Sequence, residues 1–82
     1  MASLRERYMS YFAHRGFAEI KSKSTKFRVL KGVNNQGSDM YIYLGKSGSV
    51  RVNSRDRLTD SVSITDIAKT ALVKWERQHV EQ

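Results

Sequence analysis

The 82-residue sequence contains neither cysteine nor proline, and each absence excludes a class of protein. Without cysteine the chain cannot form disulfides, bind zinc through thiolates or use a thiol nucleophile. Without proline it has no proline-rich linker or ligand segment. It also lacks an apolar run near the roughly 20 residues of a membrane-spanning helix, and residues 1–10 lack the apolar core of a secretory signal. We therefore expect a cytoplasmic protein that does not bind a membrane.

The length and composition predict a single domain that covers residues 1–82. Hydrophobic residues make up 39% of the chain and charged residues 28%, which is typical of a globular protein rather than a disordered one. A chain this short buries only about 60% of its unfolded surface, so it has little room for a deep active site. We therefore expect a binding surface on one side of a sheet or helix.

The net charge is the most informative property of the composition. Fifteen lysines and arginines against eight aspartates and glutamates give a formal charge of +7. A basic excess of this size favours a polyanionic partner, most often nucleic acid. Residues 1–38 contain eight basic and two acidic residues, whereas residues 61–82 contain three of each. The surplus lies in the first half of the chain, which disfavours a basic recognition helix at the C-terminus.

Two segments have the periodicity of amphipathic helices. Ser3 followed by Glu6 matches a capping box, and the apolar residues after it recur at helical spacing, which predicts a helix over residues 3–15. A second stripe predicts a helix over residues 63–80, with Ser63 as its N-cap. The apolar stripe of this second helix consists of Ile64, Ile67, Ala68, Ala71, Leu72, Trp75 and His79.

Three segments between the helices alternate as strands do, at residues 25–30, 39–44 and 49–53. A glycine-rich turn joins the last two into a hairpin. The order α-β-β-β-α predicts a small α+β domain, in which both helices pack on one face of a three-stranded antiparallel sheet. The inner face is predicted to carry Phe27, Val29, Met40, Ile42, Leu44, Val50 and Val52.

The other face of this sheet is predicted to lie open to solvent and to bind nucleic acid. Alternation assigns to it Lys26, Arg28, Leu30, Tyr41, Tyr43, Arg51 and Asn53. Lysines neutralise phosphates and tyrosine rings stack on bases, while Arg28 and Arg51 are the predicted readers of base edges. With the cations of adjacent loops, the predicted nucleic-acid-binding residues are Lys21, Lys23, Lys26, Arg28, Tyr41, Tyr43, Lys46, Arg51 and Arg55.

The sequence offers no catalytic, metal-binding or cofactor-binding constellation, so we predict a protein that is not an enzyme. The two histidines, His14 and His79, fall on separate predicted helices and do not have the spacing of a metal-ligand pair. The turn at residues 45–49 has the composition of a nucleotide-binding loop. Its glycine spacing differs, however, and a strand follows it instead of a helix, so a hairpin turn explains the glycines.

The predicted order of elements resembles three kinds of nucleic-acid-binding protein. It is similar to double-stranded-RNA-binding domains, although SITDIAKTAL has one lysine where those domains carry a basic cluster. It resembles small messenger-RNA-cleaving toxins, although SKSTKFRV lacks the histidine that these carry on the first strand. It is also similar to the arm-binding domains of phage integrases and to plant-type sheet readers, which lay a three-stranded sheet in the major groove. The last resemblance fits the charge placement and implies DNA rather than RNA.

Two alternatives remain open on the sequence. The first is a small inhibitor or adaptor of the phage type, which acts on a partner that processes nucleic acid. Val73 and Val80 lie one above the other on the far side of the 63–80 helix, which indicates a seam for a homodimer or a protein partner. The other alternative is an RNA-binding domain of the double-stranded-RNA-binding or toxin-like kind.

Overall fold

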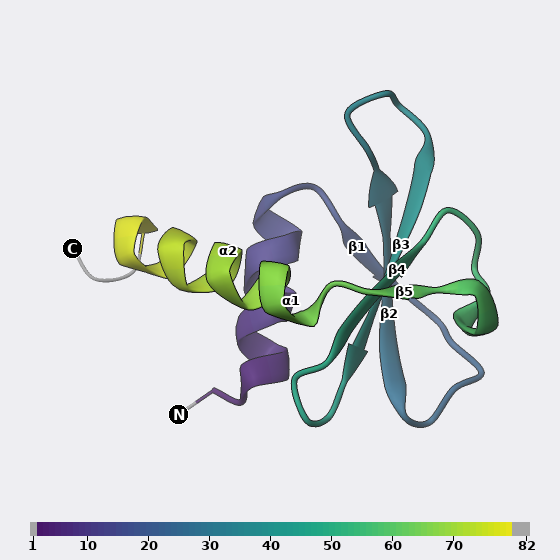
Figure 1. Cartoon of the computed structure of the whole chain (residues 1–82), viewed down its shortest axis with the longest axis horizontal. Helices are drawn as coiled ribbons and strands as arrows, with labels where there is room; N and C mark the ends of the chain where they lie inside the picture. Colours follow the sequence, from purple (N-terminus) through teal and green to yellow (C-terminus); the bar gives the residue numbers. More distant parts are fainter. Residues whose placement is uncertain (1, 80–82) are drawn as a thin grey trace.

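The computed structural model describes residues 2–79, in which two helices lie on one side of an antiparallel sheet (Figure 1). The elements are α1 (Leu4–His14), β1 (Ala18–Ile20), β2 (Phe27–Val33), β3 (Asp39–Gly45), β4 (Val50–Asn53), the 3-10 turn η1 (Leu58–Asp60), β5 (Val62–Ser63) and α2 (Thr65–His79). Each strand pairs antiparallel with the next one along the chain.

The predicted α+β class is confirmed, as is the placement of both helices on one face of the sheet. The described part of the chain has five strands in its sheet, not the predicted three. The additional strands are β1 and β5, which are three and two residues long. Strands this short do not produce a recognisable alternation of apolar and polar residues, so periodicity does not predict them.

The helix α1 begins and ends as its sequence predicts. The hydroxyl of Ser3 accepts a hydrogen bond from the Glu6 backbone N–H at 3.2 Å. After the helix, Gly16 adopts a φ of +93°, and the N–H of Phe17 donates back to the Phe12 carbonyl at 2.9 Å. The Phe17 ring then packs edge-on against Phe12 and covers Gly32 of β2, where a Cβ atom would collide with it.

The helix α2 begins two residues later than predicted. Ser63 is not its N-cap, because Ser63 belongs to β5 and pairs with Arg51. The Thr65 hydroxyl instead accepts a hydrogen bond from the Val50 backbone N–H at 3.0 Å, which ties the start of α2 to β4. Ile67 was a predicted core residue, yet it is 74% exposed. Within residues 2–79, neither helix is long and apolar enough to cross a membrane.

The core lies between the helices and the inner face of the sheet, which is the face toward α1 and α2. Its buried members are Tyr8, Tyr11, Phe12, Leu30, Ile42, Leu44, Val50, Ala68 and Leu72. The two helices also contact each other directly. Arg7 donates two hydrogen bonds to the Glu76 carboxylate, at 2.9 and 2.6 Å, and Tyr11 packs edge-on against Trp75.

The predicted assignment of residues to the two faces of the sheet is confirmed for β3 and β4, but for β2 it was wrong. Leu30 pairs with Ile42 and is 2% exposed on the inner face, whereas Val29 pairs with Tyr43 on the opposite, outer face. Phe27 shares the outer face with Val29, and Arg28 shares the inner face with Leu30. Alternation shows which residues share a face, but it does not show which face meets the helices when both carry apolar side chains.

Two turn glycines provide a test of how closely α1 packs on the β3–β4 turn. Gly48 has a φ of +93° and its missing Cβ would strike the Leu4 side chain, whereas Gly37, with a φ of +80°, has open space around it. We expect Gly37→Ala to cost about 1 kcal/mol of backbone strain and Gly48→Ala at least about 1 kcal/mol more, because its methyl group also displaces Leu4. Urea unfolding measures both. Equal losses would contradict the close packing.

Candidate nucleic-acid interface

The outer face of the sheet is not open, contrary to the prediction. Tyr43 lies in the middle of this face and is only 3% exposed, and its cross-strand neighbour Val29 is 1% exposed. The segment of residues 54–61, between β4 and β5, projects on the side of the sheet away from the helices (Figure 1). Contacts from this covering loop enclose Tyr43, so Val29 and Tyr43 form a small second core instead of a stacking surface.

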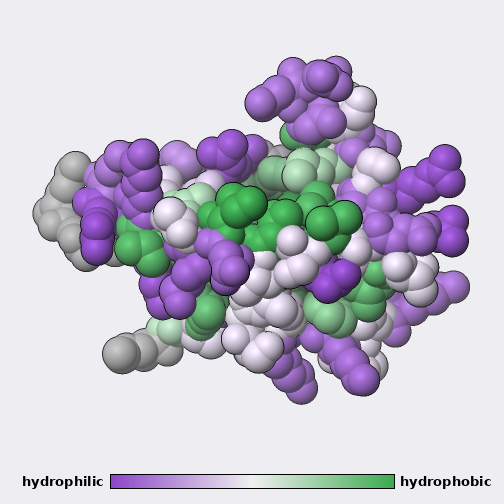
Figure 2. Space-filling model, in the orientation of Figure 1, coloured by the Kyte–Doolittle hydropathy of each residue, from purple (hydrophilic) through white to green (hydrophobic). Residues whose placement is uncertain are grey.

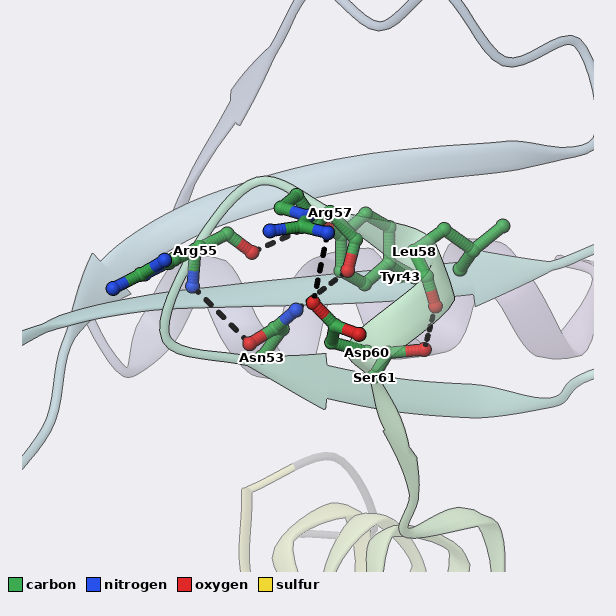
Figure 3. A network of polar contacts seen from close by, with 7 residues as sticks. All are labelled: Tyr43, Asn53, Arg55, Arg57, Leu58, Asp60 and Ser61. Carbon is green, nitrogen blue, oxygen red and sulfur yellow. Dashed lines mark hydrogen bonds and ion pairs between the residues drawn. The ribbon is translucent and has the colours of Figure 1, made fainter.

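Hydrogen bonds from the sheet hold the covering loop in place. The Tyr43 hydroxyl donates to Asp56 Oδ1 at 3.0 Å and also lies 3.3 Å from the Arg55 carbonyl oxygen. Arg51 donates through Nε to Ser61 Oγ at 2.7 Å and through Nη2 to the Ser61 carbonyl at 2.8 Å. Figure 3 shows the loop folded around Tyr43, with Asn53 and Ser61 at its two ends. The guanidinium of Arg51 is therefore occupied in holding the loop and is not free to contact base edges.

The environment of Tyr43 favours its neutral form. Burial and then the hydrogen bond to Asp56 raise the pKa of Tyr43 to about 12. An unfolded tyrosine has a pKa of about 10, so the folded protein binds this proton more tightly than the unfolded chain does. The resulting stabilisation is complete below pH 10 and is lost as the pH rises toward 12.

We expect Tyr43→Phe to lower the free energy of unfolding by about 1 kcal/mol at neutral pH, because it removes the hydrogen bond to Asp56. The difference in the free energy of unfolding between the wild type and Tyr43→Phe should then shrink as the pH rises from 10 toward 12. Urea unfolding at a series of pH values measures this difference. Tyr41→Phe is the matched control, since the Tyr41 hydroxyl makes no hydrogen bond within residues 2–79. The same pH dependence in both variants would rule out Tyr43 as the source.

Arg28, the other predicted base reader, is engaged on the inner face at the edge of the sheet. Its guanidinium donates to both carboxylate oxygens of Glu19, at 2.8 and 2.6 Å. These hydrogen bonds hold the pKa of the Glu19 carboxyl below its usual value. The pair also neutralises the acidic residue that lies closest in sequence to the β1–β2 loop, so the lysines of that loop keep their charge uncompensated.

Two further predicted nucleic-acid-binding residues, Tyr41 and Arg55, lie on the outer side of the sheet but do not contact each other. Tyr41 is half-buried, and the ammonium of its cross-strand neighbour Lys31 lies 5.8 Å from its ring centroid. Arg55 is exposed on the covering loop, and Figure 3 shows its side chain extending away from the polar network. Arg57 of the same loop forms an ion pair with Asp60 at 3.3 Å, so part of the positive charge of this loop is compensated.

Four predicted lysines gather at one end of the sheet, and we call them the lysine end. Lys21, Lys23 and Lys26 lie in the loop between β1 and β2, and Lys46 lies in the turn between β3 and β4. The pairing of Phe27 with Gly45 places loop and turn at the same end of the sheet, the lower end in Figure 1. All four lysines are exposed, and within residues 2–79 none of them pairs with a carboxylate.

Lys26 and Lys46 lie close to the last cross-strand pair at this end. Lys26 directly precedes β2 and Lys46 directly follows β3, and the last pair of these strands is Phe27 with Gly45. Both lysines line a shallow hollow whose other residues include the hydroxyl-bearing Thr25, Ser47 and Ser49. An anion in this hollow would be attracted by both ammonium groups.

Serine hydroxyls order the β1–β2 loop that carries three of the lysines. Ser22 Oγ accepts from the Ser24 N–H at 3.1 Å, and Ser24 Oγ accepts from the N–H groups of Lys26 and Phe27 at 3.2 and 3.3 Å. A hydroxyl that accepts in this way still has a proton to donate, and phosphate oxygens accept such bonds. The loop therefore combines three cations with hydroxyl donors.

Sequence reasoning named each of the four lysines but missed two features of the interface. The shared hollow of Lys26 and Lys46 depends on the strand pairing that brings loop and turn together, and the role of Asp56 depends on the position of the covering loop. The predicted seam of Val73 and Val80 stays a prediction, because Val73 is half-buried and Val80 lies outside the described residues.

Comparisons with protein families, with curated proteins and with solved structures find no match to this chain. Within residues 2–79, histidine, cysteine, aspartate and glutamate side chains form no group of three or more that could hold a metal ion.

Proposed function

We propose that the protein is a non-enzymatic nucleic-acid-binding module that holds the phosphate backbone with its lysine end. The observation that carries the proposal is the shared hollow of Lys26 and Lys46, which belong to a group of exposed lysines without carboxylate partners in the described residues. A phosphate in this hollow would be attracted by both ammonium groups. Each lysine that neutralises a phosphate also releases a condensed counterion, which favours binding at low salt.

The arrangement of the other predicted residues favours a duplex as the ligand. Proteins that bind single strands use exposed aromatic rings on which bases stack, but Tyr43 is covered and Tyr41 is half-buried. Arg28 and Arg51 are engaged within the protein, so the interface has little means to read base edges. We therefore propose duplex DNA, bound through its backbone with weak sequence preference. Duplex RNA, which presents the same phosphate chemistry, is the comparison ligand.

Fluorescence anisotropy of a short labelled DNA duplex at a series of salt concentrations tests this proposal. If each of the four lysines contacts one phosphate, the slope of log K against log salt is about −3.6. Lys26→Ala combined with Lys46→Ala should weaken binding and reduce the magnitude of the slope to about 1.8, because two contacts are lost.

The matched control is Lys74→Ala combined with Arg77→Ala, which removes the same charge from exposed positions of α2. This control should keep the wild-type slope. Binding that is independent of salt, or an equal loss in both double variants, would overturn the assignment of the lysine end. Parallel titrations with duplex RNA and with single strands show whether the backbone contact discriminates among them.

One observation favours a protein-binding role as the second candidate. A cleft between the two helices and the β2–β3 hairpin is lined largely by apolar residues, among them Phe12, Phe17 and Met40. Val33 and Ile67 stand at its walls and are 61% and 74% exposed, and Figure 2 shows hydrophobic side chains gathered near the middle of this view. An adaptor that uses this cleft would keep its partner at high salt and lose it in Ile67→Asp, with DNA binding unchanged.

A further inference from the structure

The last turns of the two helices bring both histidines of the protein together around its one tryptophan. His14 ends α1 and His79 ends α2, and their ring centroids are 5.3 Å apart. Trp75 contacts both rings, with centroid distances of 5.5 Å to His14 and 5.4 Å to His79. Both histidines are exposed, so the space beside their rings is open to solvent.

A backbone contact sets the orientation of the His79 ring. Its Nδ1 atom lies 3.0 Å from the carbonyl oxygen of Trp75. A carbonyl oxygen only accepts, so Nδ1 carries the hydrogen of this bond and Nε2 of the neutral ring keeps a lone pair. A hydrogen bond from one ring nitrogen to a carbonyl is the usual support of a histidine that binds a metal through its other nitrogen. His14 makes no hydrogen bond within residues 2–79.

We propose that His14 and His79 together bind a first-row transition-metal ion of the Zn²⁺, Ni²⁺ or Cu²⁺ type. Two imidazoles on one tetrahedral ion, with metal–nitrogen distances of about 2.0–2.1 Å, place their ring centroids about 5 Å apart. The 5.3 Å separation of His14 and His79 matches this distance. Imidazole nitrogens select these ions over Mg²⁺ and Ca²⁺, which require oxygen ligands.

The position of the site on the fold also favours a cation. Both histidines lie in the last turn of a helix, where the helix dipole presents its negative end. The described residues supply no third ligand, so water completes the coordination. A bound ion would tie the end of α1 to the end of α2, in addition to the Arg7–Glu76 ion pair. The site is separate from the lysine end and does not depend on the proposed function.

The untagged full-length protein tests the site directly, with Trp75 as the reporter. We expect CuCl₂ to quench the tryptophan fluorescence with saturation at one equivalent, because Trp75 contacts both rings. ZnCl₂ should raise the midpoint of thermal unfolding, since it binds the folded protein, and MgCl₂ should do neither. His14→Gln and His79→Gln should each weaken Cu²⁺ binding at least about tenfold, because each removes one of two ligands.

Asp66→Asn, at the opposite end of α2, is the control and should leave Cu²⁺ binding unchanged. The exposure of both histidines means that their substitution leaves the core intact, which far-ultraviolet circular dichroism checks. A single-histidine variant with wild-type affinity would show that one imidazole or another site binds the ion, and it would overturn the proposal. The absence of a saturable response in the wild type would overturn it as well.

Discussion

The hydrogen bond from Tyr43 to Asp56 ties the covering loop to the outer face of the sheet, together with the bonds from Arg51 to Ser61. The sheet has apolar side chains on both faces, and only the inner face is covered by the helices. On the outer face, Val29 and Tyr43 need a second cover, and the loop of residues 54–61 provides it. The hydroxyl of Tyr43 is buried, so it stays neutral and can donate to the Asp56 carboxylate. A partner therefore cannot lie flat against the middle of the sheet.

The distribution of charge follows from the same arrangement. Three carboxylates are each paired with an arginine: Glu19 with Arg28, Asp60 with Arg57 and Glu76 with Arg7. Four exposed lysines without a carboxylate partner in the described residues lie where the β1–β2 loop and the β3–β4 turn meet. At this end Lys26 and Lys46 line one shallow hollow with the hydroxyl-bearing Thr25, Ser47 and Ser49. Cations and hydroxyl donors around one hollow are suited to a phosphate.

Much of this arrangement could be predicted from the residues. Helical spacing and the Ser3 cap predicted α1, and strict alternation placed Ile42 and Leu44 on the inner face. The face of β2 could not be predicted in this way, because Val29 and Leu30 are adjacent, apolar and buried on opposite sides. We assigned Phe27 and Val29 to the inner face because they form the more apolar side of the strand. This assignment was wrong, since Val29 is buried on the outer face, under the covering loop.

The residues of the candidate site likewise include some that the sequence predicts and some that it does not. The pattern of charge identified Lys21, Lys23 and Lys46 as loop and turn cations. Alternation assigned Lys26 to the open face of a strand, which was wrong, because β2 begins only at Phe27 and Lys26 lies in the loop before it. Arg28 and Arg51 were misjudged because their partners, Glu19 and Ser61, become neighbours only through strand pairing and the return of the covering loop. The pairing of His14 with His79 likewise depends on how two helices pack, and no spacing within one element indicates it.

Chemical-shift mapping of the ¹⁵N-labelled protein during titration with duplex DNA shows whether the lysine end is the surface that binds. If it is, the amide signals of residues 21–26 and 45–49 move together, with little change at Tyr43, Arg51 and the residues of α2. Shifts centred on the outer face around Tyr43, or along α2, would contradict binding by the lysine end.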